Sequence, residues 1–217
     1  MRPENGRNWN PEMRENQPAP FRQSPLQTII GETDFGSSAV QSELANGLGL
    51  ADRSLLEKWG VRGADAADWL SGLGVHVPTE VYATSTLDGG GLIARIGKAE
   101  FFLEAGSRDQ SLASLRDACS SETGCTAVLH EDASILVTGR HSLQLFAQTC
   151  SHRFETSPAE KWVYTRIAGV NCGVLPQSQG EATHYALWLD PSYAVYLWET
   201  LLEIVTELGG GAIETAE

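Results

Sequence analysis

Apolar and polar positions along residues 54–63 predict a strand, and the spacing changes to that of a helix directly afterwards. The stretch SLLEKWGVRG forms the expected strand and runs up to Gly63. Asp65 and Asp68 lie on the polar side of the helix that follows. Its apolar face consists of Ala66, Trp69, Leu70 and Leu73. The junction at Gly63 is therefore predicted to be a strand-to-helix turn.

Extended segments and turns alternate over the next part of the chain. The stretch VHVPTEVYA predicts extended backbone, and the sequence DGGG at 88–91 is strong turn chemistry. The stretch LIARIGKAEFFLEA predicts a hairpin that bends at Gly97 and Lys98. A helix is expected from about Arg108 to Ser120, because apolar residues recur on one face.

The same order of elements returns in the second half of the chain. CTAVLHEDASILVTG predicts two extended runs separated by residues 130–132, with Glu131 and Asp132 at a hairpin bend. GRHSLQLFAQTC supplies another glycine followed by an amphipathic helix, and KWVYTRIAGVNCGVLP predicts two strands that bend at Gly169. THYALWLD predicts one more strand before the last helix.

The last helix has clear start and stop signals. Asp190 is expected to cap it, Pro191 suits its first turn, and the glycines 209–211 end it. Its apolar stripe consists of Ala194, Leu197, Trp198, Leu201, Ile204, Val205 and Leu208. Tyr196 and Leu202 widen the apolar surface beyond that stripe. This breadth indicates burial against a partner chain or at an interface between two subdomains.

Superposing Gly63 on Gly139 reveals an internal duplication with an offset of 76 residues. Each copy reads strand, glycine, helix, several strands and a second helix. Two such halves predict an α+β fold of two packed ferredoxin-like subdomains with mixed or antiparallel sheets. We expect the subdomains at 37–122 and 123–211, an extended or disordered N-terminal arm at 1–36, and a C-terminal tail at 212–217.

The first 25 residues contain five of the nine prolines and only two aromatic residues, Trp9 and Phe21. Such a segment cannot bury enough apolar surface to form its own core. Two interpretations remain open, simple disorder and an arm that becomes ordered along a partner subunit. In the second interpretation Trp9 and Phe21 are the anchors, and together with Tyr196, Trp198 and Leu202 they form the predicted partner interface.

Composition narrows the classes of partner. Acidic residues outnumber basic ones 28 to 15, for a formal net charge of -13, which disfavours nucleic acid and anionic membrane surfaces. No apolar run approaches the roughly 18 residues of a membrane-spanning helix, and the polar N-terminus lacks a signal-peptide core. The four cysteines form no C-x-x-C pair, so a reduced, cytoplasmic chain is expected.

Motifs for chemistry are incomplete throughout. GLIARIGKA at 91–99 has too many residues between its glycines for a phosphate-binding loop and ends in Ala99 instead of Ser or Thr. The five histidines show no metal-binding spacing, although Cys150 and His152 lie close in sequence. Ser54, Ser142 and Cys172 are candidate nucleophiles, but no sequence motif supplies a general base for any of them. We assign no catalytic residue, no metal ligand and no cofactor-binding residue.

Several segments, in the same order, resemble the gamma subunits of heterotetrameric sarcosine oxidases. The gamma subunits are relatives of the glycine cleavage T protein in the folate-binding aminomethyltransferase superfamily. The resemblance covers about residues 50–211. It rests on WGVRGADAADWLSGLGVHVP, RIGKAEFFLEA, EDASILVTGRHSLQLFAQTC, YTRIAGVNCGVLP and LWLDPSYAVYLWETLLEIVTELGG.

The resemblance implies a T-protein-like fold and a place in an oxidoreductase complex. Such complexes demethylate sarcosine with oxygen and tetrahydrofolate, giving glycine, 5,10-methylenetetrahydrofolate and hydrogen peroxide. FAD, FMN, NAD, tetrahydrofolate and zinc are implied in the alpha, beta and delta partner subunits, and no cofactor in this chain. The gamma subunit is implied to be a structural scaffold for the larger subunits.

The family's folate motif is not found at the matching place. T proteins carry an acidic residue in a YTGE-like segment, whereas the corresponding region here is IGKAEFFLE, with Glu100 as the nearest acidic residue. The KGC-Y-G type motif of a related iron–sulfur assembly branch is also absent. This departure favours a non-catalytic subunit. The alternative is a folate-binding aminomethyltransferase, or a demethylase subunit of a related dimethylamine- or N-methylglutamate-oxidising complex.

Overall fold

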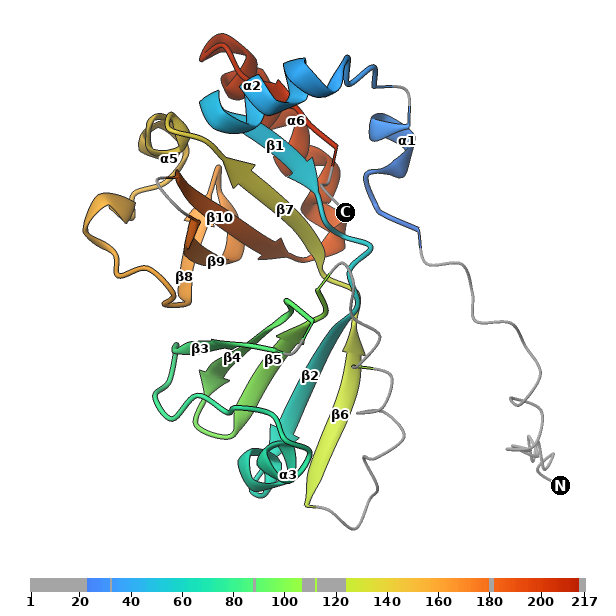
Figure 1. Ribbon diagram of the computed structural model, residues 1–217, viewed down its shortest axis with the longest axis vertical. Helices are drawn as coiled ribbons and strands as arrows, with labels where there is room; N and C mark the ends of the chain where they lie inside the picture. Colours follow the sequence, from blue (N-terminus) through green and yellow to red (C-terminus); the bar gives the residue numbers. More distant parts are fainter. Residues whose placement is uncertain are drawn as a thin grey trace, which may run out of the picture.

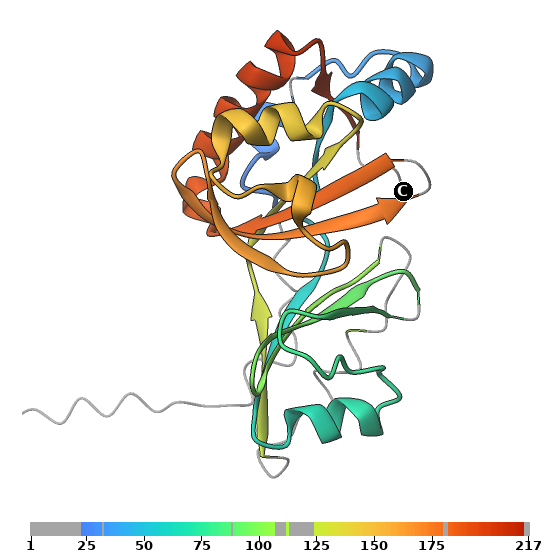
Figure 2. The same ribbon diagram turned by 90° about the vertical axis from the view of Figure 1, so that its left-hand side faces the viewer.

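Two stacked β-sheets form the centre of the computed structural model, with helices on the outer face of each (Figures 1 and 2). The structure describes residues 23–31, 33–87, 89–106, 112, 124–179 and 182–214. The described helices are α1 (Gln27–Ile30), α2 (Ser38–Gly47), α3 (Ala66–Gly72), α5 (Ser142–Thr149) and α6 (Ala194–Glu207), and short 3-10 turns occupy Phe154–Thr156 and Pro191–Tyr193. The α+β class predicted from the sequence is confirmed.

One sheet is mixed and the other is antiparallel. The upper sheet has the order β11-β1-β7-β10-β9-β8, in which only β11 runs parallel to its neighbour. Its strands are β1 (Gly49–Asp52), β7 (Ala133–Thr138), β8 (Val163–Ile167), β9 (Val170–Gln179), β10 (Ala182–Leu189) and β11 (Gly211–Ala212). The lower sheet has the order β3-β4-β5-β2-β6. Its strands are β2 (Lys58–Gly63), β3 (Thr84–Thr86), β4 (Leu92–Gly97), β5 (Glu100–Glu104) and β6 (Cys125–His130).

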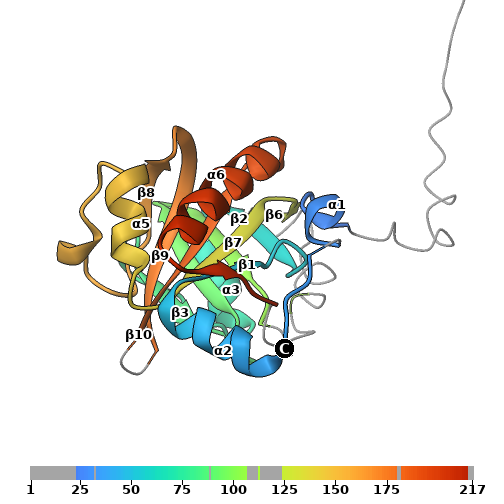
Figure 3. The ribbon, with the colours of Figure 1, turned by 90° about the horizontal axis from the view of Figure 1, so that it is seen from above.

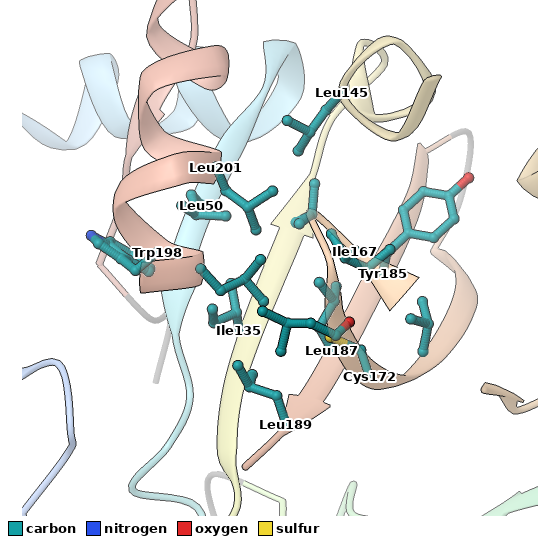
Figure 4. Packing of buried hydrophobic residues seen from close by; sticks show 14 of the residues in the cluster. Leu50, Ile135, Leu145, Ile167, Cys172, Tyr185, Leu187, Leu189, Trp198 and Leu201 are labelled. Atoms are coloured by element: carbon teal, nitrogen blue, oxygen red, sulfur yellow. The ribbon is translucent and has the colours of Figure 1, made fainter. Parts of the chain in front are cut away.

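Apolar residues form three packed layers around these sheets. The largest cluster fills the space between the upper sheet and helices α5 and α6, which cover it together with α2 when seen from above (Figure 3). Figure 4 shows Trp198 and Leu201 of α6 beside Leu50 of β1 and Ile135 of β7 in this cluster. A second cluster lies between α3 and the lower sheet, and a third lies between the two sheets. The third cluster positions the candidate site.

The two sheets exchange strands across the predicted boundary at residues 122 and 123. β1 precedes β2 in the chain but pairs with β7 in the upper sheet, whereas β6 precedes β7 but pairs with β2 in the lower sheet. Residues 131–132 therefore connect two sheets, and the hairpin bend predicted at Glu131 and Asp132 is wrong. A short polar turn is compatible with either connection, because local sequence does not specify which strand becomes the partner.

The strand–glycine–helix unit on which the predicted internal duplication rests occurs twice among the described residues. β2 runs into α3 through a turn at Gly63, and β7 runs into α5 through a turn at Gly139. Gly63 and Gly139 have positive φ angles of 149° and 99°. A Cβ at Gly139 would lie 2.4 Å from the carbonyl oxygen of Gly47. Both glycines are thus required by backbone conformation and close approach.

Alanine at Gly139 is expected to destabilise the fold by more than about 2 kcal/mol, since the positive φ and the clash with Gly47 act together. Gly74 is the matched control, because its φ is 83° but no atom lies within 4 Å of its added Cβ. Gly74→Ala should cost only about 1–2 kcal/mol. Urea denaturation of both variants measures the difference, and equal losses would contradict the close-approach explanation.

Other predicted elements differ in extent. The hairpin at Gly97 and Lys98 and the two strands that bend at Gly169 are confirmed as β4–β5 and β8–β9. The stretch VHVPTEVYA, by contrast, contributes only an isolated bridge between Ala83 and Lys161. The helix predicted at 108–120 lies outside the described residues except for Leu112, which is buried.

The segment predicted as an arm at 1–36 contains folded structure near its end. Leu26 is fully buried in the main cluster, and α1 follows it directly. The Ser24 hydroxyl donates a hydrogen bond to the Asp52 carboxylate at the end of β1. The segment that begins at Ser24 is therefore attached to the upper sheet by the buried side chain of Leu26 and by the hydrogen bond of Ser24. Trp9 and Phe21 lie outside the described residues.

Candidate functional site

A pocket of about 720 Å³ opens between the two sheets. Residues from β4 and β5 line it on one side, and the β8–β9 hairpin and the end of β10 line it on the other. The connection from β6 to β7 forms part of its wall through His130 and Asp132. Pockets that lie between two packed units of a fold are common ligand sites, so this one is the leading candidate.

Three aromatic rings form the floor of this pocket. The indoles of Trp162 and Trp188 are stacked with centroids 4.6 Å apart and planes 17° apart. Phe102 of β5 packs against both, at 5.3 Å and 5.5 Å between ring centroids. Gly173 of β9 allows this arrangement, because a Cβ there would lie 2.3 Å from a ring carbon of Trp162. The floor is therefore a rigid apolar surface that joins the two sheets.

The two indole N–H groups of the floor differ in their hydrogen bonding. The Trp188 indole donates a hydrogen bond of 2.6 Å to Oε2 of Glu104. The Trp162 indole nitrogen is buried and has no hydrogen-bond partner among the residues that the structure describes. Buried donors without a partner are uncommon in folded proteins, so this N–H is a candidate contact for a hydrogen-bond acceptor of a ligand.

His130 and Asp132 form the polar wall of the pocket. His130 Nδ1 lies 2.9 Å from a carboxylate oxygen of Asp132, and the imidazole contacts the edge of Phe102 with centroids 5.9 Å apart. The hydrogen bond to Asp132 raises the pKa of His130 above its ordinary value, while partial burial acts in the opposite direction. The pair can bind a polar group or exchange a proton near neutral pH.

Asp132→Asn is expected to lower the pKa of His130, because a neutral amide oxygen stabilises the imidazolium less than the charged carboxylate does. The folded-state pKa of His130 lies above the unfolded value of about 6.5, so this contact contributes stability that is fully present below about pH 6.5. That contribution is lost as the pH rises through the folded-state pKa. NMR titration of the imidazole measures the shift, with Glu131→Gln as the control. An unchanged pKa in Asp132→Asn would contradict the contact.

The nucleophile candidates are occupied by structural contacts. Burial raises the pKa of the Cys172 thiol to about 12, which leaves it protonated and unreactive at neutral pH. The Ser142 hydroxyl is buried and donates to the carbonyl of Gly139 in the strand-to-helix turn. The Ser54 hydroxyl is buried as well and accepts a hydrogen bond from the backbone N–H of Ser134. None of the three is positioned as a nucleophile.

Among the described residues, no group of three or more His, Cys, Asp and Glu side chains lies together in a way that could hold a metal ion. Cys150, which the sequence placed near His152, contacts the Thr165 hydroxyl at 3.4 Å. His152 Nε2 lies 2.6 Å from the Ser157 hydroxyl. These two side chains are therefore engaged in separate hydrogen bonds.

A buried ionic cluster lies behind the aromatic floor. The carboxylate of Glu104, at the end of β5, is 3.0 Å from the Arg53 guanidinium and 3.7 Å from the Lys58 ammonium. It also accepts hydrogen bonds from the Ser134 hydroxyl and the Trp188 indole. Glu104 thus connects the linker after β1 with β2 and β5 of the lower sheet and with β7 and β10 of the upper sheet. Its acceptor oxygens are satisfied by the protein itself.

Lys58 is hydrogen-bonded to the linker between β1 and β2. Its ammonium group donates hydrogen bonds to the carbonyls of Ser54 at 3.1 Å and Leu56 at 2.9 Å, and its side chain has no exposed area. These carbonyls belong to the linker that carries the chain from the upper sheet to the lower one. The side chain therefore fixes the angle at which β1 leads into β2.

A second, more polar pocket of about 350 Å³ lies on the other side of this cluster. Arg53 and Glu104 line it from the cluster, and the hydroxyls of β3 line its outer part. His184 of β10 also borders it, and burial lowers the pKa of that imidazole.

The residues predicted for a partner interface occupy different environments. Trp198 is buried in the chain's own core, and Leu202 packs against that core while remaining partly exposed. Tyr196 is exposed, and its hydroxyl donates to the carbonyl of Ala168 in the β8–β9 turn. Only Tyr196 among the three therefore presents most of its surface to solvent. Trp198 is a core residue, as the apolar stripe of α6 requires.

Sequence reasoning missed the residues that build the site. Glu100, the nearest acidic residue to the expected folate position, is partly exposed and pairs with Arg62 at 3.0 Å. The buried acid is Glu104, at the other end of the same strand. The signal for it was a carboxylate directly after the apolar run FFL, paired with the lone lysine of the strand KWGVRG. Charges inside apolar strands are buried only when they are paired.

Solved structures of other proteins share the fold, and two of them are described here. One chain of heterotetrameric sarcosine oxidase from Corynebacterium sp. U-96, in complex with pyrrole 2-carboxylate, matches with a TM-score of 0.68 and 17% identity, over 90% of this chain and 98% of that chain. Glycine cleavage system aminomethyltransferase T from Bartonella henselae matches with a TM-score of 0.67 and 13% identity, over 88% of this chain. The match spans 59% of the aminomethyltransferase.

These matches confirm at the level of fold the resemblance noted from the sequence. No protein-family model matches the chain, and no curated protein matches it at a significant level. No helix in the described part of the chain is long and apolar enough to cross a membrane. The shared fold and the pocket between the sheets are therefore the basis for a functional conclusion.

Proposed function

We propose that this chain is a gamma-type subunit of a heterotetrameric, flavin- and tetrahydrofolate-dependent sarcosine oxidase complex, in which it acts as a scaffold without a reaction centre of its own. One observation carries the proposal. The match to a chain of heterotetrameric sarcosine oxidase extends over 98% of that chain, whereas only 59% of the aminomethyltransferase is matched. A subunit-sized match favours a subunit role over the role of a complete aminomethyltransferase.

The chemistry of the side chains supports a scaffold. The thiol of Cys172 is held in its protonated form, the Glu104 carboxylate is surrounded by protein donors, and Ser142 caps a turn. The hydrogen bond from Trp188 to Glu104 and the packing of Phe102 against both indoles join the two sheets, which suits a protein that holds larger neighbours in a fixed geometry. Its effect on turnover is then exerted through assembly.

In this proposed complex, the oxidation of the amine and the transfer of its one-carbon unit both take place in the partner subunits. FAD, FMN, NAD, tetrahydrofolate and zinc belong to the alpha, beta and delta subunits, which convert sarcosine, oxygen and tetrahydrofolate to glycine, 5,10-methylenetetrahydrofolate and hydrogen peroxide. A related complex that oxidises dimethylamine or N-methylglutamate is the variant of this proposal in which another amine is selected by the large subunits.

A turnover measurement on the assembled complex tests the scaffold role. Replacing both His130 and Asp132 by alanine removes the proton-exchanging pair of the pocket. Peroxide formation per assembled complex should then remain within about twofold of the original value, because the scaffold takes no part in the reaction. Loss of a true general acid–base residue would instead lower the rate by a factor of about 100 or more. A loss of that size in fully assembled complex would show that the chain takes part in the reaction.

A second candidate function, folate binding by this chain, is favoured by the pocket itself. Its volume of about 720 Å³, its aromatic floor and the unpartnered Trp162 indole N–H suit a planar heterocycle with a hydrogen-bond acceptor. Tetrahydrofolate titration of the isolated chain, followed by tryptophan fluorescence and calorimetry, distinguishes the candidates. One-to-one binding at micromolar concentration that is weakened in Trp162→Phe would favour the folate-binding function over the scaffold.

A further inference from the structure

We propose that Cys150 and Cys172 form a peroxide-sensitive thiol pair, in which hydrogen peroxide oxidises the Cys150 thiol to a sulfenic acid and the Cys172 thiol then converts it to a disulfide bond. The bond is a property of this chain alone. The source of the oxidant rests on the proposed function, because hydrogen peroxide is a product expected of the complex.

The two cysteines lie on the face of the upper sheet that α5 covers. Cys172 of β9 belongs to the largest apolar cluster (Figure 4), and Cys150, directly after α5, packs against the same cluster. Cys172 is paired across the strands with Thr165 of β8. Side chains at such opposite positions point to the same face, with Cβ atoms about 4.5–5.5 Å apart. The Thr165 hydroxyl lies 3.4 Å from Cys150 Sγ. Both cysteines are therefore neighbours of one small side chain.

The titration of Cys172 agrees with this proximity. Burial is the main cause that raises its pKa to about 12, and the charge of Cys150 acts in the same direction. A disulfide bond requires Cα atoms about 4.4–6.8 Å apart. Its formation therefore reports whether the two residues approach as closely as their shared neighbour indicates.

Access to peroxide differs between the two thiols. Cys150 is partly exposed and lines another pocket, of about 220 Å³, beside α5 and the 3-10 turn at Phe154–Thr156. Hydrogen peroxide is little larger than water, which needs a cavity of only about 10–15 Å³. Cys172 is 2% exposed and protonated at neutral pH, so it reacts poorly with peroxide from solution. Cys150 is therefore the thiol that peroxide oxidises first.

The two steps balance with hydrogen peroxide as the oxidant. In the first step the Cys150 sulfur attacks one peroxide oxygen, the O–O bond breaks, and the sulfenic acid and one water molecule form. In the second step the Cys172 sulfur attacks the Cys150 sulfur and the S–O bond breaks, so that the sulfenic oxygen leaves as water with the Cys172 proton. Fixed proximity makes this step intramolecular, which offsets the protonation of the Cys172 thiol.

The bond would attach the loop after α5 to β9. Cys172 also lines the pocket between the sheets, and Ser151, next to Cys150, lines both that pocket and the smaller one beside α5. Oxidation therefore links the walls of the two pockets covalently.

Peptide mapping of the full-length chain after peroxide treatment tests the inference. The reduced chain is incubated with hydrogen peroxide, the excess is removed with catalase, and the remaining thiols are alkylated before digestion and mass spectrometry. We expect a linked pair of peptides that carry Cys150 and Cys172, lighter by two hydrogen atoms than the reduced peptides and separated again by dithiothreitol. The same treatment in urea should lose most of this linked pair, because the fold no longer holds the two thiols together.

Two serine variants assign the roles of the thiols. In Cys172→Ser, Cys150 should remain a sulfenic acid that dimedone traps, whereas Cys150→Ser should leave Cys172 reduced. The mapping of the unmodified chain needs no variant, so the test stands even where a variant fails to fold. Recovery of both cysteines as alkylated thiols, or of Cys150 as a sulfinic acid beside a reduced Cys172, would overturn the inference. An equal yield of the linked pair in urea would do the same. None of these outcomes bears on the subunit function, which fails instead if the chain purifies without flavin-bearing partners.

Discussion

Replacing Glu104 by alanine is expected to lower the free energy of unfolding by about 3–5 kcal/mol, because it removes the buried carboxylate that pairs with the Lys58 ammonium and the Arg53 guanidinium. The same change removes the acceptor of the Trp188 indole and of the Ser134 hydroxyl. A buried donor that loses its partner bears its full desolvation cost. Urea denaturation followed by circular dichroism measures the loss.

Glu100→Ala is the matched control for Glu104→Ala, because both carboxylates lie on β5 and both are paired with an arginine. Arg62 is largely exposed and Glu100 is partly exposed, so their ion pair contributes about 0–1 kcal/mol. If the free energy of unfolding falls by the same small amount in both variants, the ionic cluster does not stabilise the connection between the two sheets. The double variant in which Lys58 is also replaced by methionine should recover part of the loss, since the buried positive charge is then removed together with the carboxylate.

Trp198→Ala is expected to lower the free energy of unfolding by about 3–5 kcal/mol, the range found for large aromatic deletions in protein cores. The indole is 1% exposed and belongs to the largest apolar cluster, beside Leu50 and Leu201 (Figure 4). Its removal leaves a cavity between α6 and the upper sheet, which the surrounding strands cannot fill. Thermal and urea denaturation of the isolated chain measure this cost.

Tyr196 on the same helix is the control for Trp198. It is 54% exposed, and its main contact is the hydrogen bond from its hydroxyl to Ala168. Tyr196→Ala should therefore change the stability of the isolated chain by less than about 1 kcal/mol. A change below about 1 kcal/mol in Trp198→Ala as well would mean that α6 does not pack on the sheet through this face.

Much of the local structure follows from the sequence because glycines and apolar spacing act over short distances. Gly63 and Gly139 mark strand-to-helix turns whose backbone requires glycine, and the stripe of α6 follows from its helical period. The segment before Ser54 was harder to predict. The helix α2 has the sequence SAVQSELANG and buries no residue completely, so its pattern gives little signal.

Pairing between distant strands does not follow from such local patterns. The bend at residues 130–132 is compatible with a hairpin, and only the fold shows that it connects the two sheets. Lys58 and Glu104 lie far apart in the sequence, so their ion pair depends on how β2 and β5 pair. The pocket likewise combines His130, Trp162 and Trp188 from three separate regions. Each is an ordinary residue in its own segment, and only their juxtaposition is informative.

Co-purification from the native host tests the central claim most directly. The chain is tagged at its C-terminus at its own locus and isolated at physiological salt, and the product is examined by size-exclusion chromatography, flavin absorbance and sarcosine-dependent peroxide formation. The subunit function predicts a single complex that contains the chain, larger flavin-bearing subunits and this activity. A chain that elutes alone, with no flavin-containing protein attached, would contradict it.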